Sequence, residues 1–298
     1  MEDKNSQINI YEQPLIQNEN NNCDYNYVYD GGCINCGEKK VLMGDVLLCG
    51  SIYVKKNGIL EIRPGTNIYI KNECEPIVIV IDSDGILNAD GNKCEKIVFQ
   101  SSNKNNVKSQ WGGIIIHGYN CNFEHECVNS LIYKCNRCNK NCCCKNSILN
   151  HVIIKNAGIN NYDSLMLSGI DNNIKIDNII ICHSGNNGLF LDNTKIKLNY
   201  LYINDVFKNG ILINNNVDSF INYLYIKDSY NFSLFVNSNK CKNTLDFKNV
   251  YLDIIKSKGV TNVNGDCQID LNIKEIINDS KNNIEKSITN DDFKDFIK

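Results

Sequence analysis

The second half of the chain repeats one pattern of apolar and polar positions. Five segments each carry apolar residues at their first, fourth and sixth positions, and they recur at intervals of roughly 22 to 27 residues. The segments begin at Leu149, Ile176, Leu198, Ile221 and Phe247. An amphipathic helix would need apolar residues three and four positions apart along its length, and these segments lack that spacing. The pattern therefore predicts a short β-strand that recurs once per repeat.

A second apolar strand follows three of these segments. It reads GLFL at 188–191, GILI at 210–213 and SLFV at 233–236, and its apolar residues follow the two-residue period of a strand. Two strands in each period, joined by turn-rich segments, predict a parallel β-helix whose coils stack about 4.8 Å apart. The first half contains further short strands separated by Gly, Pro and Asp, so we expect about nine or ten coils in all.

Asparagine is abundant, and many asparagines fall between the expected strands. Asn tolerates the left-handed conformation of turns, and stacked turns allow side-chain amides to hydrogen-bond along the axis of the stack. We therefore expect turn chemistry, and not ligand binding, from Asn156, Asn186, Asn187 and residues 214–216.

A series of motifs runs in order through residues 44–190. It comprises a Pro-Gly-Thr turn, the strand-turn GILNADG, an Ile-x-Phe strand, a Trp-Gly-Gly strand and an Asn-Ala-Gly turn. The residues concerned are Pro64, Gly65, Thr66, Gly85, Ile86, Ala89, Gly91, Ile97, Phe99, Trp111, Gly112, Gly113, Asn156, Ala157 and Gly158. In this series the chain resembles pectin-lyase-like proteins of bacterial cell surfaces that contain the Trp-Gly-Gly strand. The resemblance implies an all-β fold, a single-stranded right-handed parallel β-helix.

The patterns divide the chain into three parts. Residues 1–40 form an Asn-rich N-terminal arm or cap, and residues 41–270 form the β-helix, interrupted by a Cys-rich loop insert at 119–147. In residues 271–298 several isoleucines approximate helical spacing, which predicts a C-terminal helical cap. These are Ile273, Ile276, Ile277, Ile284 and Ile288.

Sixteen cysteines are many for a chain of this kind, and the largest group lies in the insert. That group comprises Cys121, Cys127, Cys135, Cys138, Cys142, Cys143 and Cys144, with His125 among them. A further pair with CxxC spacing, Cys33 and Cys36, lies near the N-terminus. Thiolates at this spacing suit tetrahedral zinc, but disulfides formed in an oxidised particle and reduced thiols are equally open interpretations. As disulfides or as metal ligands, the cysteines would staple a loop that has little core of its own.

Charge and side-chain chemistry argue against several classes of function. The formal net charge is −3, and Arg63 and Arg137 are the two arginines, which disfavours nucleic-acid recognition. A β-helix hydrolase needs paired carboxylates, and the candidates Asp82, Asp84 and Asp90 fall in an expected turn.

The four histidines do not form a triad with any Ser and Asp by sequence pattern. They are His117, His125, His151 and His183, and we expect them to be structural. The sequence therefore predicts no catalytic residues.

The expected function is that of a non-enzymatic structural or adhesive β-helix protein. The N-terminus lacks the apolar segment of a signal peptide and no apolar run is long enough to span a bilayer, so we expect synthesis in the cytosol. The abundance of Asn, Ile and Lys points to an AT-rich genome, which favours a virion or surface component of a large DNA virus. Expected partners are proteins of a larger assembly, including further copies of the chain. The alternative is a carbohydrate-active or carbohydrate-binding β-helix protein.

Overall fold

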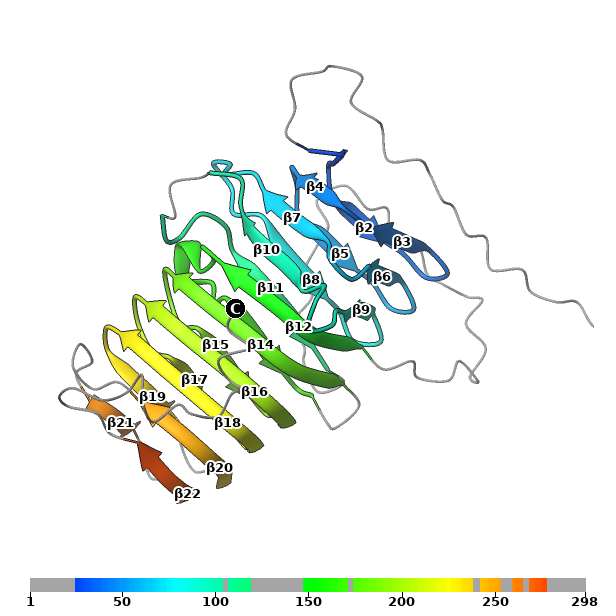
Figure 1. Cartoon of the computed structure of the whole chain (residues 1–298). Helices are drawn as coiled ribbons and strands as arrows, with labels where there is room; N and C mark the ends of the chain where they lie inside the picture. The colour runs from blue at the N-terminus through cyan, green and yellow to red at the C-terminus, as the bar shows by residue number, and fades with distance from the viewer. Residues whose placement is uncertain are drawn as a thin grey trace, which may run out of the picture.

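The computed structural model describes residues 25–103, 107–118, 147–170, 174–237, 242–252, 259–264 and 268–277. Within these residues the strands form two sheets, and successive strands of each sheet stack as rungs from the blue end to the red end of Figure 1. Every pairing between described strands is parallel. The predicted all-β parallel β-helix is therefore confirmed as a parallel β-solenoid.

The strand bounds follow the two sheets. The 13-stranded sheet A contains β1 (Tyr27–Tyr29), β3 (Lys39–Leu42), β4 (Asp45–Leu48), β6 (Ile59–Ile62), β7 (Asn67–Ile70), β9 (Ile86–Asp90), β10 (Ile97–Ser101), β12 (Ile148–Lys155), β14 (Lys175–Ser184), β16 (Lys195–Val206), β18 (Asp218–Ser229), β20 (Lys242–Leu252) and β22 (Gln268–Ile277). The 9-stranded sheet B contains β2 (Gly32–Ile34), β5 (Ile52–Val54), β8 (Val78–Ile81), β11 (Gly113–His117), β13 (Leu165–Ser168), β15 (Leu189–Asp192), β17 (Ile211–Ile213), β19 (Phe232–Asn237) and β21 (Gly259–Asn264). One 3-10 turn, η1, spans Ile159–Asn161.

Two features differ from the expectation. Strands β1, β2 and β3 extend the sheets to the N-terminal side of residue 41. At the other end, Leu271 to Ile277 belong to strand β22, so the predicted C-terminal helix is wrong for these residues. The spacing of Ile273 and Ile277 is compatible with a strand as well as with a helix, and pairing with β20 favours the strand. Residues 278–298 lie outside the described part.

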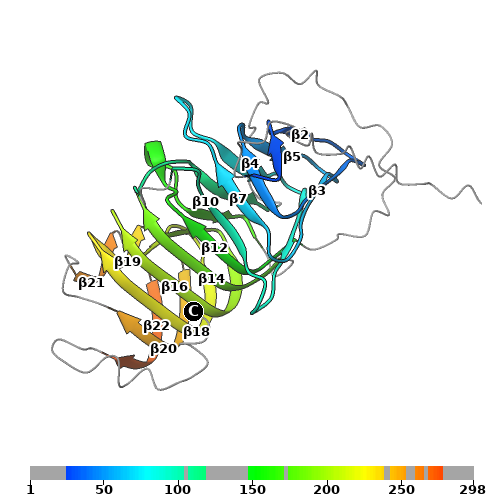
Figure 2. The same ribbon diagram turned by 45° about the horizontal axis from the view of Figure 1, so that its top comes forward.

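The cross-section of the solenoid changes at β12. Before it, sheet A is built from separate short strands, and β3, β6 and β9 form a branch of their own. Strand β12 joins the two branches, since its residues 148–150 pair with β9 and its residues 152–154 pair with β10. His151 bends the strand between these parts with φ of 50°, and Asn178 does the same in β14 with φ of 53°. The later strands of sheet A are correspondingly long and curved (Figure 2).

The apolar columns predicted from the sequence form the core. Residues at equivalent positions of successive coils pair directly, as in Val152 with Ile179 and Ile179 with Leu201. The fourteen side chains of the three columns that the structure describes are at most 2% exposed: Leu149, Ile176, Leu198, Ile221, Phe247, Val152, Ile179, Leu201, Leu224, Val250, Ile154, Ile181, Ile203 and Ile226. Full burial of each such side chain stabilises the fold by about 1.5–3 kcal/mol.

Trp111 anchors the point at which the chain enters β11. Its side chain is fully buried, its ring stacks on Phe99 with centroids 6.4 Å apart, and its Nε1 donates to the backbone oxygen of Lys155 at 2.8 Å. The next residues must be glycines because a Cβ at Gly112 would meet Val78 at 2.2 Å and one at Gly113 would meet the oxygen of Asp163 at 2.2 Å. The Trp-Gly-Gly segment is thus a packed strand entry.

Asparagine amides connect successive coils, as the sequence predicted. Inside one corner, Asn187 Nδ2 donates to Asp163 Oδ1 at 2.8 Å, and Asn209 Nδ2 donates to Asn187 Oδ1 at 2.8 Å. Nearer the surface, equivalent bonds link Asn215 to Asp192 at 3.1 Å. The buried ladder satisfies polar groups that would otherwise be costly to remove from water.

We expect the buried ladder to contribute more to stability than the outer one. Asn187→Ala leaves the backbone N and Nδ2 of Asn209 without their acceptor in the interior and removes one of the donors to Asp163 Oδ1, so the free energy of unfolding should fall by about 2–3 kcal/mol. The matched control Asn215→Ala, at a half-buried position, should cost about 0.5–1 kcal/mol. Urea unfolding followed by the fluorescence of Trp111 measures both, and equal losses would contradict the interpretation.

Stability should also depend on pH through Asp163. Burial raises the pKa of Asp163 to about 6, and hydrogen bonds from Asn187 act in the opposite direction. Because the folded-state pKa lies above the unfolded value, this group lowers the free energy of unfolding as pH rises from 4 to 7, by about 3 kcal/mol at most. Asp163→Asn keeps the accepting oxygen, so the variant should equal the wild type at pH 4 and exceed it at pH 7. A stability difference that is the same at both pH values would rule out this role.

Candidate functional site

One corner of the solenoid presents a column of polar side chains in four successive coils. Asn156, His183, Asp205 and Asp228 occupy equivalent positions, with φ of 60°, 56°, 56° and 53°. Asn, Asp and His are the non-glycine residues that tolerate this left-handed conformation best. The local sequence therefore folds into a corner with one polar side chain per coil, of which that of Asn156 is buried.

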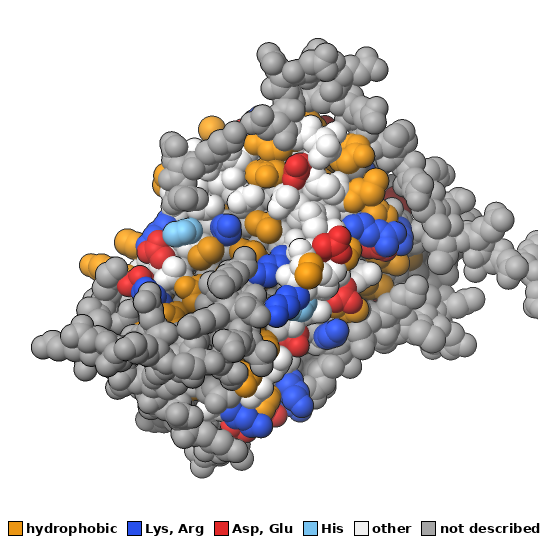
Figure 3. All heavy atoms as spheres, viewed as in Figure 1, with side chains coloured by type: hydrophobic (Ala, Val, Ile, Leu, Met, Phe, Trp, Pro, Cys, Tyr) orange, Lys and Arg blue, Asp and Glu red, His pale blue; other side chains and the backbone are white. Residues whose placement is uncertain are grey.

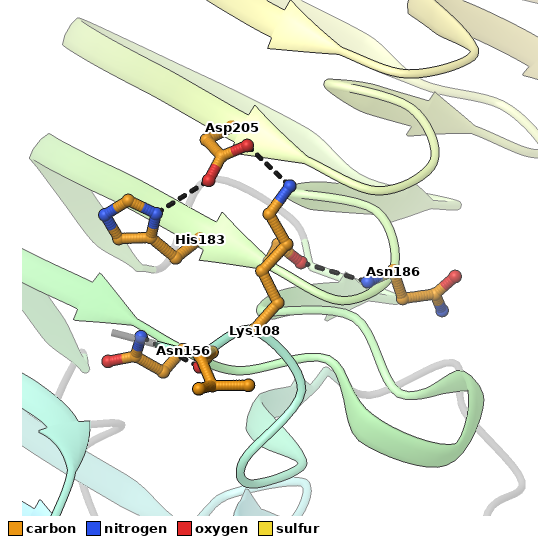
Figure 4. Close-up of polar contacts among 7 residues, drawn as sticks. Lys108, Asn156, His183, Asn186 and Asp205 are labelled. Carbon is orange, nitrogen blue, oxygen red and sulfur yellow. Dashed lines mark hydrogen bonds and ion pairs between the residues drawn. The ribbon is translucent and has the colours of Figure 1, made fainter. Parts of the chain in front are cut away.

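Lys108, His183 and Asp205 form a connected group at this corner, which we call the corner cluster (Figure 4). His183 Nδ1 lies 2.7 Å from Asp205 Oδ2, and Lys108 Nζ lies 2.5 Å from Asp205 Oδ1. Their side chains are about one-third exposed, so solvent reaches them. The carboxylate favours a proton on Nδ1 of the neutral imidazole, which leaves the lone pair on Nε2.

The charge of Asp205 is stabilised within the cluster. Burial alone would raise the pKa of Asp205, but hydrogen bonds from Lys108 and His183 outweigh burial and hold the pKa below its ordinary value. Asp205 is therefore ionised at neutral pH and orients the imidazole. The hydrogen bond to Asp205 makes His183 an oriented proton acceptor.

The segment that carries Lys108 is fixed to the corner by contacts on both sides. The Gln110 backbone N donates to the Asn156 oxygen at 2.7 Å, and Asn156 Nδ2 donates to the Val107 oxygen at 3.0 Å. Ser109 lies where a side chain at position 185 would be, since a Cβ on Gly185 would come within 1.4 Å of its Oγ. Gly185 thus leaves the space in which this segment packs.

Exposed apolar side chains gather at the same corner. Among the described residues, the exposed large hydrophobic side chains are Met43, Val107, Phe207 and Tyr230, and the last three lie at or beside this corner. Phe207 and Tyr230 are 54% and 60% exposed, and their rings stack with centroids 5.6 Å apart and planes 7° apart. Figure 3 shows acidic, basic and histidine side chains next to apolar ones near one edge of the described surface. We call Val107, Phe207, Tyr230 and the corner cluster together the corner surface.

A second aromatic group lies on the outer face of sheet A. Tyr200 stacks on Tyr223 at 4.7 Å, Tyr202 stacks on Tyr225 at 4.8 Å, and Tyr225 stacks on Tyr251 at 4.2 Å. These five residues form the tyrosine face. Burial raises the pKa of Tyr202 to about 12, so its hydroxyl remains protonated at neutral pH.

The cysteines predicted as metal or disulfide candidates are divided between the two parts of the chain. Cys121, Cys127, Cys135, Cys138, Cys142, Cys143 and Cys144 lie outside the described residues, together with His125, so the staple and zinc hypotheses stay predictions. Cys33 lies on β2, and Cys36 follows it in a turn, where its Sγ accepts from Asn57 Nδ2 at 3.9 Å. No three metal-binding side chains gather within the described residues.

The carboxylates considered for hydrolysis form ion pairs or hydrogen bonds with side chains of neighbouring coils. Asp82 pairs with Lys55 at 2.8 Å, and Asp84 pairs with Lys56 at 3.0 Å. Asp90 accepts from Asn150 Nδ2 at 2.9 Å. These contacts, each to a neighbouring coil, explain the carboxylates as structural groups of the corners.

The arginine and the histidines of the sequence analysis occupy separate places. Arg63 pairs with Glu61 at 2.9 Å in the Pro-Gly-Thr turn region, whereas Arg137 lies outside the described residues. His117 ends strand β11, and His151 bends β12. His183, expected to be structural, forms a hydrogen bond with Asp205 that the sequence did not indicate. The repeat indicates that His183 and Asp205 are neighbours, because Asp205 follows His183 by one coil. Nothing in the sequence indicates that Lys108 lies beside them.

Comparison with known proteins agrees with the architecture. Residues 42–135 match the model of a pectate-lyase-like β-helix domain. The chain contains a pectate-lyase-like parallel β-helix domain. No curated protein and no solved structure matches the chain. No helix of the described residues has the length and apolar character needed to cross a membrane.

The electrostatic role of Lys108 can be tested directly. Lys108→Met removes the ammonium while burial of Asp205 remains, so the pKa of Asp205 should rise. Carboxyl ¹³C NMR titration of Asp205 measures the change. Lys208→Met is the control, because Lys208 does not contribute to the shift at Asp205. Identical titration of Asp205 in the wild type and the Lys108 variant would disprove the assignment.

Proposed function

We propose that this chain is a non-enzymatic structural or adhesive β-helix protein whose corner surface contacts other proteins of an assembly. The observation that carries the proposal is the concentration of exposed apolar side chains, Val107, Phe207 and Tyr230, at one corner of an otherwise well-buried solenoid. Exposed apolar groups on a folded protein are typical of interaction sites when they gather in one place. The ion pairs of Asp82 and Asp84 and the hydrogen bond of Asp90 with neighbouring coils also support a non-enzymatic role.

We further propose that the assembly is the particle or surface of a large DNA virus. The abundance of Asn, Ile and Lys supports an AT-rich genome. The ordered motifs from the Pro-Gly-Thr turn to the Asn-Ala-Gly turn support kinship with the Trp-Gly-Gly group of surface proteins. In this proposal the members of that group are non-enzymatic scaffolds. A stiff rod with repeating outer faces suits such a role, because each coil offers the same kind of contact along the axis.

The second candidate is carbohydrate binding at the tyrosine face. Its support is the group of stacked rings, in which Tyr200 and Tyr202 on one coil and Tyr223 on the next are partly exposed. Tyrosine side chains combine apolar ring area with a hydroxyl that hydrogen-bonds, and both suit a sugar chain that runs along the axis. A glycan array would show binding that Tyr200→Ala weakens.

The structural role predicts where the protein is found. Quantitative mass spectrometry of purified particles should detect the chain at a constant ratio to the main coat component across preparations. Density-gradient fractions without particles serve as the control and should be depleted of it. If the chain is absent from particles but abundant in infected-cell lysate, the particle role is wrong.

A further inference from the structure

We infer that the tyrosine face is the docking site of segment 278–298 of the same chain. The inference goes beyond the proposed function and does not depend on it. The face lies on the outside of the solenoid, because Tyr202 stands between Leu201 and Ile203, which point into the core. An aromatic side chain at such a position meets solvent unless another group packs on the sheet from outside.

The low exposure of two of these tyrosines indicates such a group. Tyr251 is 6% exposed and Tyr225 is 8% exposed. Stacking alone does not account for this, because Tyr230 at the corner also stacks on a neighbouring ring, that of Phe207, and is 60% exposed. Stacking covers the faces of the rings, whereas their outer edges and hydroxyls are covered only by a group that lies across the stack.

Segment 278–298 begins next to this face. Tyr251 pairs with Ile277, the last residue of β22, so Ile277 holds the register position that tyrosines occupy in the preceding coils. Tyr202, Tyr225 and Tyr251 lie on three consecutive coils, a distance of about 10 Å along the axis. The stretch of about fifteen residues between Ile277 and Phe293 spans up to about 50 Å, so Phe293 can return over any of these rings.

The apolar residues of the segment suit an aromatic surface. Phe293, Phe296 and Ile297 are three and four positions apart, the spacing at which side chains share one side of a helical turn. Two phenylalanines on that side can meet the outer edges of the tyrosine rings, and such contacts between aromatic rings are favourable. The residues around them are charged, so the turn would present its polar side to solvent.

The charges near the face favour the same segment. Lysines outnumber carboxylates among the described residues beside the tyrosines; they are Lys197, Lys227 and Lys248, against Asp228 and Asp246. In residues 291–295 of the segment, three aspartates accompany one lysine. The acidic stretch around Phe293 is therefore complementary to the basic surroundings of the face.

This arrangement would regulate access to the face. A sugar chain or any other ligand of the tyrosine face would have to displace segment 278–298 first, so its apparent affinity would be reduced by the fraction of molecules in which the segment is docked.

Hydroxyl-radical footprinting of the full chain, read by mass spectrometry, tests the contact. In the wild type, Tyr225 and Tyr251 should react weakly and Tyr230 strongly. The triple variant Phe293→Ser, Phe296→Ser, Ile297→Ser should raise the reactivity of Tyr225 and Tyr251 about fivefold, toward that of Tyr230, because the outer ring edges lose their contacts. Met43→Ser, which removes a half-exposed apolar side chain elsewhere, is the control and should leave both tyrosines protected. Unchanged fluorescence of the buried Trp111 would show that each variant is folded.

A photo-crosslink identifies the partner directly. The variant Phe296→benzoylphenylalanine should link to β18 or β20 within a single chain when it is irradiated.

Three outcomes would overturn the inference. Tyr225 and Tyr251 could react as strongly as Tyr230 in the wild type, which would show an open face. They could stay protected in the triple variant, which would show that another part of the chain covers them. Their protection could also increase with protein concentration, which would identify a second copy as the cover. None of these outcomes bears on whether the chain is found in particles.

Discussion

Hydrogen bonds between parallel strands of successive coils determine everything else in this molecule. Once Val152 pairs with Ile179 and Ile179 with Leu201, every residue of a coil is placed above its equivalent in the next. Like side chains then stack on like: isoleucine and leucine in the core, asparagine at the corners and tyrosine on the outer face. No coil can bury its apolar side alone, so the order of the stack and the burial of the core arise together.

The same constraint explains why the architecture could be predicted and why other features could not. Apolar columns at Leu149, Ile176 and Leu198 are visible as periodicity because each position repeats along the axis. The helix expected in the C-terminal segment is wrong for Ile273 to Ile277, because isoleucine spacing alone does not distinguish a helix from a strand and pairing with β20 favours the strand. The corner cluster was not predictable, since Lys108 comes from a connecting segment whose path depends on the space left by Gly185.

The site illustrates how a regular scaffold acquires individual chemistry. Asn156, His183, Asp205 and Asp228 share one backbone conformation, and in the middle pair the short hydrogen bond between His183 and Asp205 is joined by the ammonium of Lys108 from a distant segment. The backbone of the coil supplies direction and spacing, and the identity of each side chain supplies the charge. Function at such a corner therefore requires few substitutions, because the geometry is already present in every coil.

The bend of β12 at His151 has a consequence for how the rod could change in length. After this point one long strand replaces two short ones in sheet A, and equivalent residues recur every 22 to 27 residues, as in the 23 residues from Leu201 to Leu224. Coils beyond the bend are close to interchangeable, so a gene duplication or deletion of one unit there would preserve register on both sides. The length of this half can therefore change in evolution by one coil at a time. The junction at β12 cannot be duplicated or deleted in this way, because two different cross-sections meet there.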